Sequence, residues 1–339
     1  QAGAYIQDEI RFSTFTLALA ARADYFSSLE DINFSPRAAL IWTPVDGHSF
    51  KVSFARAFRA PSAVENYLEL HFVGGWIPLD AFDPDLTEPF PLVVNMYGNP
   101  DLKAETIDSF EIGYSAVLNG GLTHLEANVY VSEIHDKIAT QPSTAALIEA
   151  GVEPFYTSEN PPPGWPLNPI VIDFLALQGV YLPANYMALN IGSIRSAGIE
   201  LSARHTFRRG VTLFGNYSYQ SLPEMLDPIG DPNRPPSDSV NTPPLHRFNA
   251  GATYNGQRYL GNLTVNYSDR AFFAQGIQPF YYGYSDSYTL VSASAGRRWS
   301  DGWLTTNLKV LNLFDDPVIQ HVFGDVIRRT VMLEALFRF

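Results

Sequence analysis

The sequence predicts an all-β fold, an antiparallel up-and-down β-barrel that spans a membrane. Three observations predict it. Apolar and polar residues alternate over many segments, short and long connections between these segments also alternate, and the chain of 339 residues ends in the strand-like segment 331–339. A period of two places apolar side chains on one face and polar side chains on the other, as expected where one face meets lipid and the other a water-filled lumen.

Composition narrows the class of protein. The chain has 25 prolines and 24 glycines, which suits many strands joined by turns, and its lack of cysteine excludes disulfides and thiolate metal sites. A formal net charge of −13 argues against a nucleic-acid partner, because neutralising phosphates requires clustered Lys and Arg. Apolar runs of the roughly 20 residues that a membrane helix needs are absent. The first residues do not resemble a signal peptide, so we expect a mature or truncated product.

The strands follow the alternation along the chain. Phe15, Leu17 and Leu19 alternate with more polar neighbours, and so do later sets of apolar residues: Phe50, Val52 and Phe54; Leu125, Ala127 and Val129; Val211 and Leu213; Leu304, Leu308 and Val310; and finally Val331, Leu333, Ala335, Phe337 and Phe339. In order, about thirteen strands are predicted near 2–11, 14–25, 34–44, 49–59, 104–117, 121–135, 187–205, 210–222, 245–255, 258–270, 284–298, 302–313 and 327–339.

The connections between these strands alternate in length. Short turns are predicted at 12–13, 45–48, 118–120, 206–209, 256–257 and 299–301, and long connections at 26–33, 60–103, 136–186, 223–244, 271–283 and 314–326. Because antiparallel strands reverse direction at each connection, all short turns share one rim, all long loops share the other, and the last strand ends on the short-turn rim. A soluble sandwich or propeller is disfavoured, since soluble strands are usually about 5–6 residues long and no blade repeat is visible.

Several segments then point to a family. They are Ala57-Phe58-Arg59-Ala60-Pro61-Ser62; Gly98 to Glu105 leading into Ser109 to Tyr114; Asn190 through Gly198 to Leu201; and Asn312 to Pro317, followed by the terminal Phe339. In this order and spacing they resemble the C-terminal barrel of TonB-dependent outer-membrane receptors. The resemblance implies a barrel of about 22 strands, occluded by an N-terminal plug that carries the TonB-contacting box.

The sequence departs from this family pattern in three ways. It has no plug, no TonB box and only about thirteen strands, so we expect it to supply only part of the 22-stranded barrel that the resemblance implies. An open sheet would expose two unpaired edges to lipid, which backbone hydrogen bonding disfavours. We therefore expect residues 1–339 to be the C-terminal portion of a receptor barrel, either truncated or one piece of a split receptor. A smaller self-closing barrel remains open as an alternative.

The function expected from this resemblance is TonB-energised uptake of a scarce ligand, such as siderophore-bound iron, a corrinoid or a similar compound. The alternative is a passive porin-like channel. An outer-membrane enzyme is least favoured, because no nucleophile, P-loop or zinc-protease motif is present. The seven histidines are scattered, and Asp83, Asp85 and Glu88 lack the pattern of a calcium loop. Neither a metal nor a cofactor is therefore predicted.

Ligand capture is expected to use the aromatic residues of the long loops and the arginines of the lumen. The candidate ligand-contacting residues are Arg59, Tyr67, His71, Trp76, Tyr97, Tyr156, Trp165, Tyr181 and Arg195. The other interpretation is that the aromatic residues pack against one another or form the membrane-interface belt. Loop 60–103 has seven acids and one lysine, net −6, and loop 136–186 has five acids and one lysine, net −4. These charges favour a neutral or cationic ligand.

The expected partners follow from the same resemblance. They are outer-membrane lipid, the TonB complex through the missing plug, a small-molecule ligand, and the barrel-assembly machinery through the C-terminal strand; nucleic acid is not among them. Phe337 and Phe339 are the expected assembly signal. The expected location is the bacterial outer membrane.

Overall fold

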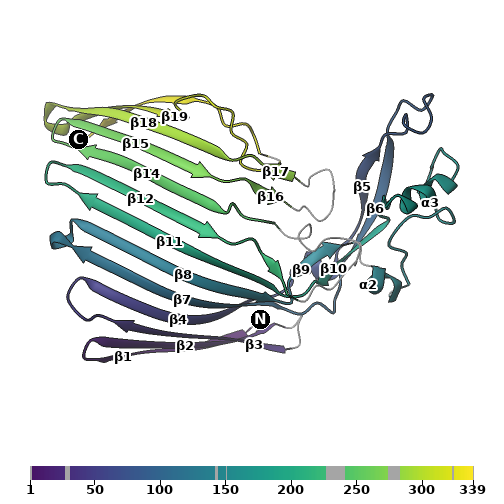
Figure 1. Cartoon of the computed structure of the whole chain (residues 1–339), viewed down its shortest axis with the longest axis horizontal. Coiled ribbons are helices and arrows are strands. Elements are labelled where there is room, and N and C mark those ends of the chain that lie inside the picture. Colours follow the sequence, from purple (N-terminus) through teal and green to yellow (C-terminus); the bar gives the residue numbers. More distant parts are fainter. Residues whose placement is uncertain are drawn as a thin grey trace.

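The computed structural model describes residues 2–26, 31–141, 144–149, 151–226, 241–273, 283–322 and 324–338. Most of them form one broad, curved antiparallel sheet, called the wall sheet below (Figure 1). A second sheet of four strands, called the loop sheet, projects beyond one end of it. The two sheets use the same backbone geometry, but they cover their apolar faces differently.

The wall sheet contains thirteen strands that pair in the order in which they occur along the chain. They are β1 (Ala2–Phe12), β2 (Phe15–Phe26), β3 (Asp31–Trp42), β4 (His48–Arg59), β7 (Glu105–Leu118), β8 (Thr123–His135), β11 (Ile194–Thr206), β12 (Val211–Gln220), β14 (His246–Asn255), β15 (Tyr259–Ser268), β18 (Tyr288–Trp299), β19 (Leu304–Leu311) and β20 (Thr330–Phe337). A short strand, β13 (Glu224–Met225), adds to β11. The predicted antiparallel sheet of thirteen long strands is confirmed.

The short turns lie together at one end of the wall sheet, and the longer connections lie at the other (Figure 1). One predicted connection is wrong. Phe26 pairs with Asp31, so both strands extend into the connection expected over 26–33, and Asp24 and Asn33 continue the ladder. Asp24 is 1% exposed and accepts two hydrogen bonds from Arg22, so a charged residue at this end of the strand is paired within the sheet and does not end the strand.

A second prediction also needs correction. The single strand expected over 187–205 is two strands, because the chain breaks at Gly192, whose φ of 108° lies in the left-handed region. The first part, β10 (Asn185–Asn190), belongs to the loop sheet, and only β11 belongs to the wall. Loops 223–244 and 271–283 are described only at their ends, the latter including a small hairpin of β16 (Ala271–Phe273) and β17 (Gly283–Ser285).

The outward face of the wall is a continuous apolar surface. Leu40, Val52, Ile112, Val129 and Ile199 form one row across neighbouring strands. Val52, Ile112 and Val129 are 56%, 63% and 53% exposed. Water-soluble proteins rarely leave so large an apolar face uncovered, whereas a membrane barrel covers it with lipid. The predicted apolar faces therefore all lie on the same side.

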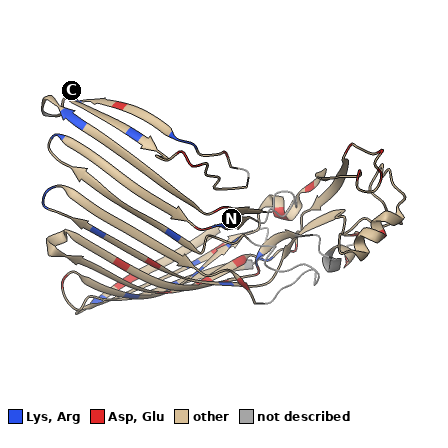
Figure 2. Ribbon diagram, turned by 45° about the horizontal axis from the view of Figure 1, so that its top comes forward, with Lys and Arg blue, Asp and Glu red and all other residues tan. Residues whose placement is uncertain are grey.

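The opposite, luminal face is polar. Lys51, Asn128, Glu200, Ser218 and Arg247 lie in one row of paired residues that alternates with the apolar rows. Charged residues are sparse over much of the wall, and acidic and basic residues are interspersed where they occur (Figure 2). Lys51 pairs with Glu111 at 2.5 Å, and Lys309 pairs with Glu334 at 3.0 Å, so luminal charges brace neighbouring strands. No helix in the described part of the chain is long and apolar enough to cross a membrane.

Candidate functional site

The loop sheet is the most elaborate feature on the long-connection rim. Its strands are β5 (Glu69–Ile77), β6 (Phe90–Tyr97), β10 and β9 (Ile138–Gln141), in the spatial order β5-β6-β10-β9. Three short helices accompany it: α1 (Ala63–Tyr67), α2 (Thr144–Glu149) and α3 (Ile170–Leu177). The connections predicted as loops 60–103 and 136–186 thus fold together. The parallel pairing of β6 with β10 joins them.

This sheet has its own hydrophobic core. Leu92 and Val94 of β6 are 6% and 1% exposed, and they pack with Ile172 of α3 and with Leu182 and Tyr186. The buried residues of β6 alternate with half-buried ones, so one face is covered by the segment that carries α3. A core of its own gives the loop sheet a defined shape that exposed loops would lack.

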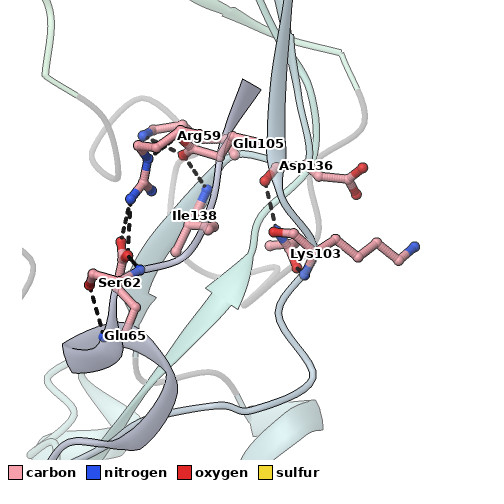
Figure 3. Close-up of polar contacts among 9 residues, drawn as sticks. Arg59, Ser62, Glu65, Lys103, Glu105, Asp136 and Ile138 are labelled. Carbon is pink, nitrogen blue, oxygen red and sulfur yellow. Dashed lines mark hydrogen bonds and ion pairs between the residues drawn. The ribbon is translucent and has the colours of Figure 1, made fainter. Parts of the chain in front are cut away.

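A group of ion pairs fastens the loop sheet to the wall (Figure 3). Glu105, at the start of β7, accepts a hydrogen bond from Arg59 Nε at 2.6 Å, one from Lys137 Nζ at 2.8 Å and one from the backbone N–H of Ile138 at 2.6 Å. Arg59 also donates to Glu65 of α1 at 2.9 Å. Because Glu105 is only 8% exposed, these charge-assisted bonds lie where water competes least.

The helix α1 begins at a capping box. Ser62 Oγ accepts from the backbone N–H of Glu65 at 3.2 Å, and Glu65 accepts from the backbone N–H of Ser62 at 2.7 Å. Burial opposes the charge of Glu65, but hydrogen bonds from Arg59 and Ser62 outweigh it, so the pKa of Glu65 lies below its usual value. Glu65 therefore caps the helix and pairs with the wall in one ionised state.

Asn190 ties the bases of both long connections together. Its side-chain oxygen accepts from the backbone N–H of Lys103 at 3.0 Å, and its Nδ2 donates to the carbonyl of Asp136 at 2.7 Å (Figure 3). One side chain thus bonds the end of the first connection and the start of the second. Sequence reasoning counted Asn190 only as part of a family motif and missed this role.

The structure spreads the predicted aromatic contacts along the loop sheet. Tyr67, Trp76 and Tyr181 are 64%, 54% and 45% exposed, and Tyr97 is half-buried. Within the described ranges, no ring contact joins these four residues to each other; Tyr181 packs on Phe155 with ring centroids 5.3 Å apart. They offer several separate contact points rather than one aromatic cage.

Two other predicted aromatic residues contribute to the core. Tyr156 is 8% exposed, donates its hydroxyl to the carbonyl of Val93 at 2.6 Å, and has its pKa raised by burial. Trp165 packs edge-to-face on Phe90 at 5.2 Å. Neither ring is a free surface in this conformation, as the packing interpretation of the sequence anticipated.

The polar residues of the predicted site also have partners. Arg59 is held by Glu105 and Glu65, and His71 Nδ1 hydrogen-bonds Asn95 Oδ1. Arg195 pairs with Glu133 at 2.9 Å, and its register with Ala197 and Ile199 places it on the outward face. The expectation that Arg195 faces the lumen is therefore wrong. Arg195 lies two residues nearer to the long-connection rim than Ala197, at the edge of the apolar surface.

The last strand carries the predicted assembly signal. Phe337 pairs with Leu304 on the outward face, and its ring meets Trp303 edge-to-face with centroids 5.4 Å apart. This aromatic pair sits at the short-turn end, where a membrane-interface girdle is expected. Phe339 lies outside the described residues, so its part of the prediction stays a prediction. In the described part of the chain, no cluster of three or more His, Asp or Glu side chains could hold a metal ion.

Comparisons with known proteins agree with this architecture. The chain is 27% identical over 198 residues to the heme/hemopexin utilization protein C of Haemophilus influenzae, covering 56% of this chain and 22% of that protein. The fold matches the siderophore receptor PirA of Acinetobacter baumannii with a TM-score of 0.67 at 18% identity, covering 99% of this chain and 45% of that one.

A third similar protein is the FrpB iron transporter of Neisseria meningitidis, with a TM-score of 0.64 at 18% identity, covering 98% of this chain and 44% of that one. The chain thus spans less than half the length of each of these relatives. The sequence model of the family described as TonB-dependent receptor-like β-barrel matches residues 1–313 of this chain. The chain therefore belongs to the family of TonB-dependent receptor β-barrels.

Proposed function

We propose that the protein takes up a scarce, iron-bearing ligand across the bacterial outer membrane, energised by TonB. The observation that supports this proposal best is the loop sheet on the long-connection rim. It has its own hydrophobic core and is ion-paired to the wall sheet. Such a module presents fixed contact points for a ligand at the entrance to the lumen. The names of the relatives, a heme utilization protein, a siderophore receptor and an iron transporter, share iron as cargo.

In this proposal residues 1–339 supply part of the barrel wall and the ligand-capturing loops. Tyr67, His71, Trp76, Tyr97 and Tyr181 remain the candidate ligand contacts, with Arg59, Tyr156 and Trp165 holding the module in shape. The TonB complex acts through a plug outside this sequence, and the barrel-assembly machinery acts on β20 through Phe337 and Phe339. The chain has no enzymatic role in this scheme.

Growth under iron limitation tests the proposal. A host lacking its own receptors should grow on heme or on a ferric siderophore when it expresses the full-length protein. This growth should stop when TonB is deleted. Growth that persists without TonB would favour the passive porin-like channel. Absence of growth on every iron source tried, with the protein assembled in the outer membrane, would overturn the proposal.

A further inference from the structure

Arg297 lies on the outward face of the wall sheet, close to the short-turn rim. It pairs with Tyr259 of β15 on one side and with Thr306 of β19 on the other. Thr306 follows two residues after Leu304, which the register places on the outward face, so Arg297 faces outward as well. The barrel strands and the plug that we expect outside this sequence would lie beyond the edges of the sheet and in the lumen, so they would not cover this position.

The guanidinium of Arg297 rests on aromatic rings and not on a carboxylate. Its central carbon lies 3.8 Å from the ring centroid of Trp299 and 5.9 Å from that of Tyr259. The indole N–H of Trp299 donates to Thr306 Oγ1 at 2.9 Å, which fixes the ring against the cation. Among the described residues Arg297 has no hydrogen-bond or ion-pair partner, and its Nε is shielded from solvent. This cation therefore lacks the acceptor that a charge away from bulk water requires.

The short-turn rim is basic on this side of the wall. Residues 206–211, 255–260, 297–304 and 336–338 form its turns and strand ends, and their charged residues are six arginines and one acid: Arg208, Arg209, Arg258, Arg297, Arg298, Arg338 and Asp301. The short turns 13–14, 43–47 and 119–122 carry no arginine or lysine, and their one acid is Asp46. Figure 2 shows basic residues at the short-turn ends of the later strands. This part of the rim therefore favours an anionic partner.

The outward face at the level of Arg297 also carries aromatic side chains. Five of them are exposed, namely Tyr254, Tyr259, Trp299, Trp303 and Phe337. Aromatic girdles of this kind mark the boundary between the hydrocarbon core of a membrane and its headgroups. In outer-membrane barrels the short turns face the periplasm, so Arg297 lies at the headgroups of the periplasmic leaflet. The anion that this level supplies is the phosphate of a phospholipid.

The surface beside Arg297 leaves room for an acyl chain. The next outward residue of β18 toward the middle of the wall is Ala295, which pairs with Gly261 of β15. Apart from its neighbours in the chain, a Cβ at Gly261 would meet no atom nearer than 3.9 Å, so the space over this glycine is open. A chain can therefore pack along these small residues while its phosphate lies at Arg297.

We propose that Arg297 binds the phosphate of an anionic phospholipid in the periplasmic leaflet. Trp299 holds the guanidinium, and an acyl chain lies over Ala295 and Gly261. The planar guanidinium can donate to two phosphate oxygens at once. An anionic headgroup is favoured over a zwitterionic one, because the neighbouring arginines repel the cation of the zwitterion. The site requires only that the wall spans a membrane, so it goes beyond the uptake proposal and does not rest on it.

Lipid binding to the full-length protein in detergent tests the site. Native mass spectrometry measures the Kd of the first bound molecule of dioleoylphosphatidylglycerol, which is anionic, and of dioleoylphosphatidylcholine, which is zwitterionic. Arg297→Gln should weaken binding of the anionic lipid about 5-fold, the contribution of one basic residue at an anionic membrane surface. It should leave binding of the zwitterionic lipid unchanged. Arg297→Lys keeps the charge without the planar fork and should recover part of the loss.

Arg204→Gln is the matched control, because it removes an exposed arginine near the same rim but on the luminal face. It should change binding of neither lipid. Equal binding of phosphatidylglycerol by wild type and Arg297→Gln would overturn the inference, and so would an equal loss in Arg204→Gln. An equal loss for both lipids in Arg297→Gln would overturn it as well, because the headgroup charge would then not be recognised.

The deacylated headgroup, glycerophosphoglycerol, separates a lipid from a free anion. It should bind far more weakly than phosphatidylglycerol, because it has no chain to pack beside Arg297. Equally tight binding would assign the site to a soluble anion and overturn the lipid site. None of these results bears on the uptake proposal, which TonB-dependent growth tests separately.

Discussion

The wall sheet and the loop sheet place the same kind of strand in opposite surroundings. In the wall, the apolar residues of a strand point outward and stay exposed, as Val52 does at 56%. In β6 of the loop sheet, the apolar residues point inward and are covered, as Val94 is at 1%. Alternation thus tells which face is apolar, and only the tertiary structure tells whether lipid or protein covers it.

The largest difference in stability between the two sheets should come from a substitution in the core of the loop sheet. Leu92→Ala removes a buried side chain and should cost about 2–5 kcal/mol of local stability. The loop sheet should then become sensitive to protease between residues 69 and 97 while the wall still migrates as a folded barrel. Trp76→Ala, at an exposed position of β5, is the control and should leave cleavage unchanged. Loss of the wall together with the loop sheet would contradict the independence of the two units.

The wall should respond to charge on one face only. Ile112→Arg puts a cation on the outward face and should cost about 2–4 kcal/mol if it lies near the bilayer midplane. Ser202→Arg, on the luminal face of β11, should cost much less. Urea unfolding in liposomes measures both. Equal losses for the two variants would mean that the assignment of faces is wrong.

The joint between the two sheets, which Glu105 forms with Arg59, Lys137 and Ile138, should show an intermediate loss of stability. Glu105→Gln leaves Arg59 and Lys137 with a weaker acceptor and should cost about 1–3 kcal/mol at the joint. Hydrogen exchange should rise at Ile138, whose N–H bonds Glu105, and not at the core of β7. Glu111→Gln is the matched control, because its pair with Lys51 is more exposed and should contribute under about 1 kcal/mol. Unchanged exchange at Ile138 would refute the role of Glu105.

A fall in pH should produce the smallest loss of stability, and this loss should be confined to α1. The pKa of Glu65 is lowered in the folded protein, so its stabilisation is complete at neutral pH and is lost as the pH falls through the folded-state pKa. Exchange of the amides of Ser62 and Glu65 should therefore increase below about pH 4, near the unfolded pKa of a glutamate. Glu65→Gln should remove this pH dependence. Equal acid sensitivity in that variant would assign the effect to another group.

The wall could be predicted from sequence because its information is local. Each strand shows its own alternation, and neighbouring strands pair in chain order, as Ile112 does with Val129. The loop sheet could not be predicted in this way. Asn95 of β6 pairs in parallel with Asn185 of β10, far along the chain, and β5 has a register shift between Val73 and Gly75 that breaks its period.

The candidate site was predicted only in part. The aromatic residues were placed on the correct rim, but burial of Tyr156 depends on α3 and β10, which the sequence did not reveal. Arg195 shows a different kind of failure. Counting by twos from Ile199 through Ala197 would have placed it on the outward face. Its charge suggested the lumen, but above the lipid the outward face is also wet, so charge alone does not identify the lumen there.

Single-cysteine labelling tests the central claim most directly, since the chain has no cysteine of its own. A fluorophore is placed at successive positions of β11 and β6 in the full-length protein in liposomes, with any cysteine outside these 339 residues replaced by serine, and its quenching from lipid or from water is measured. We predict that Ile199 and Leu201 positions are quenched from lipid, Glu200 and Ser202 from water, and Val94 from neither. Quenching of all of these positions from water would contradict a lipid-covered wall that carries a separately packed loop sheet.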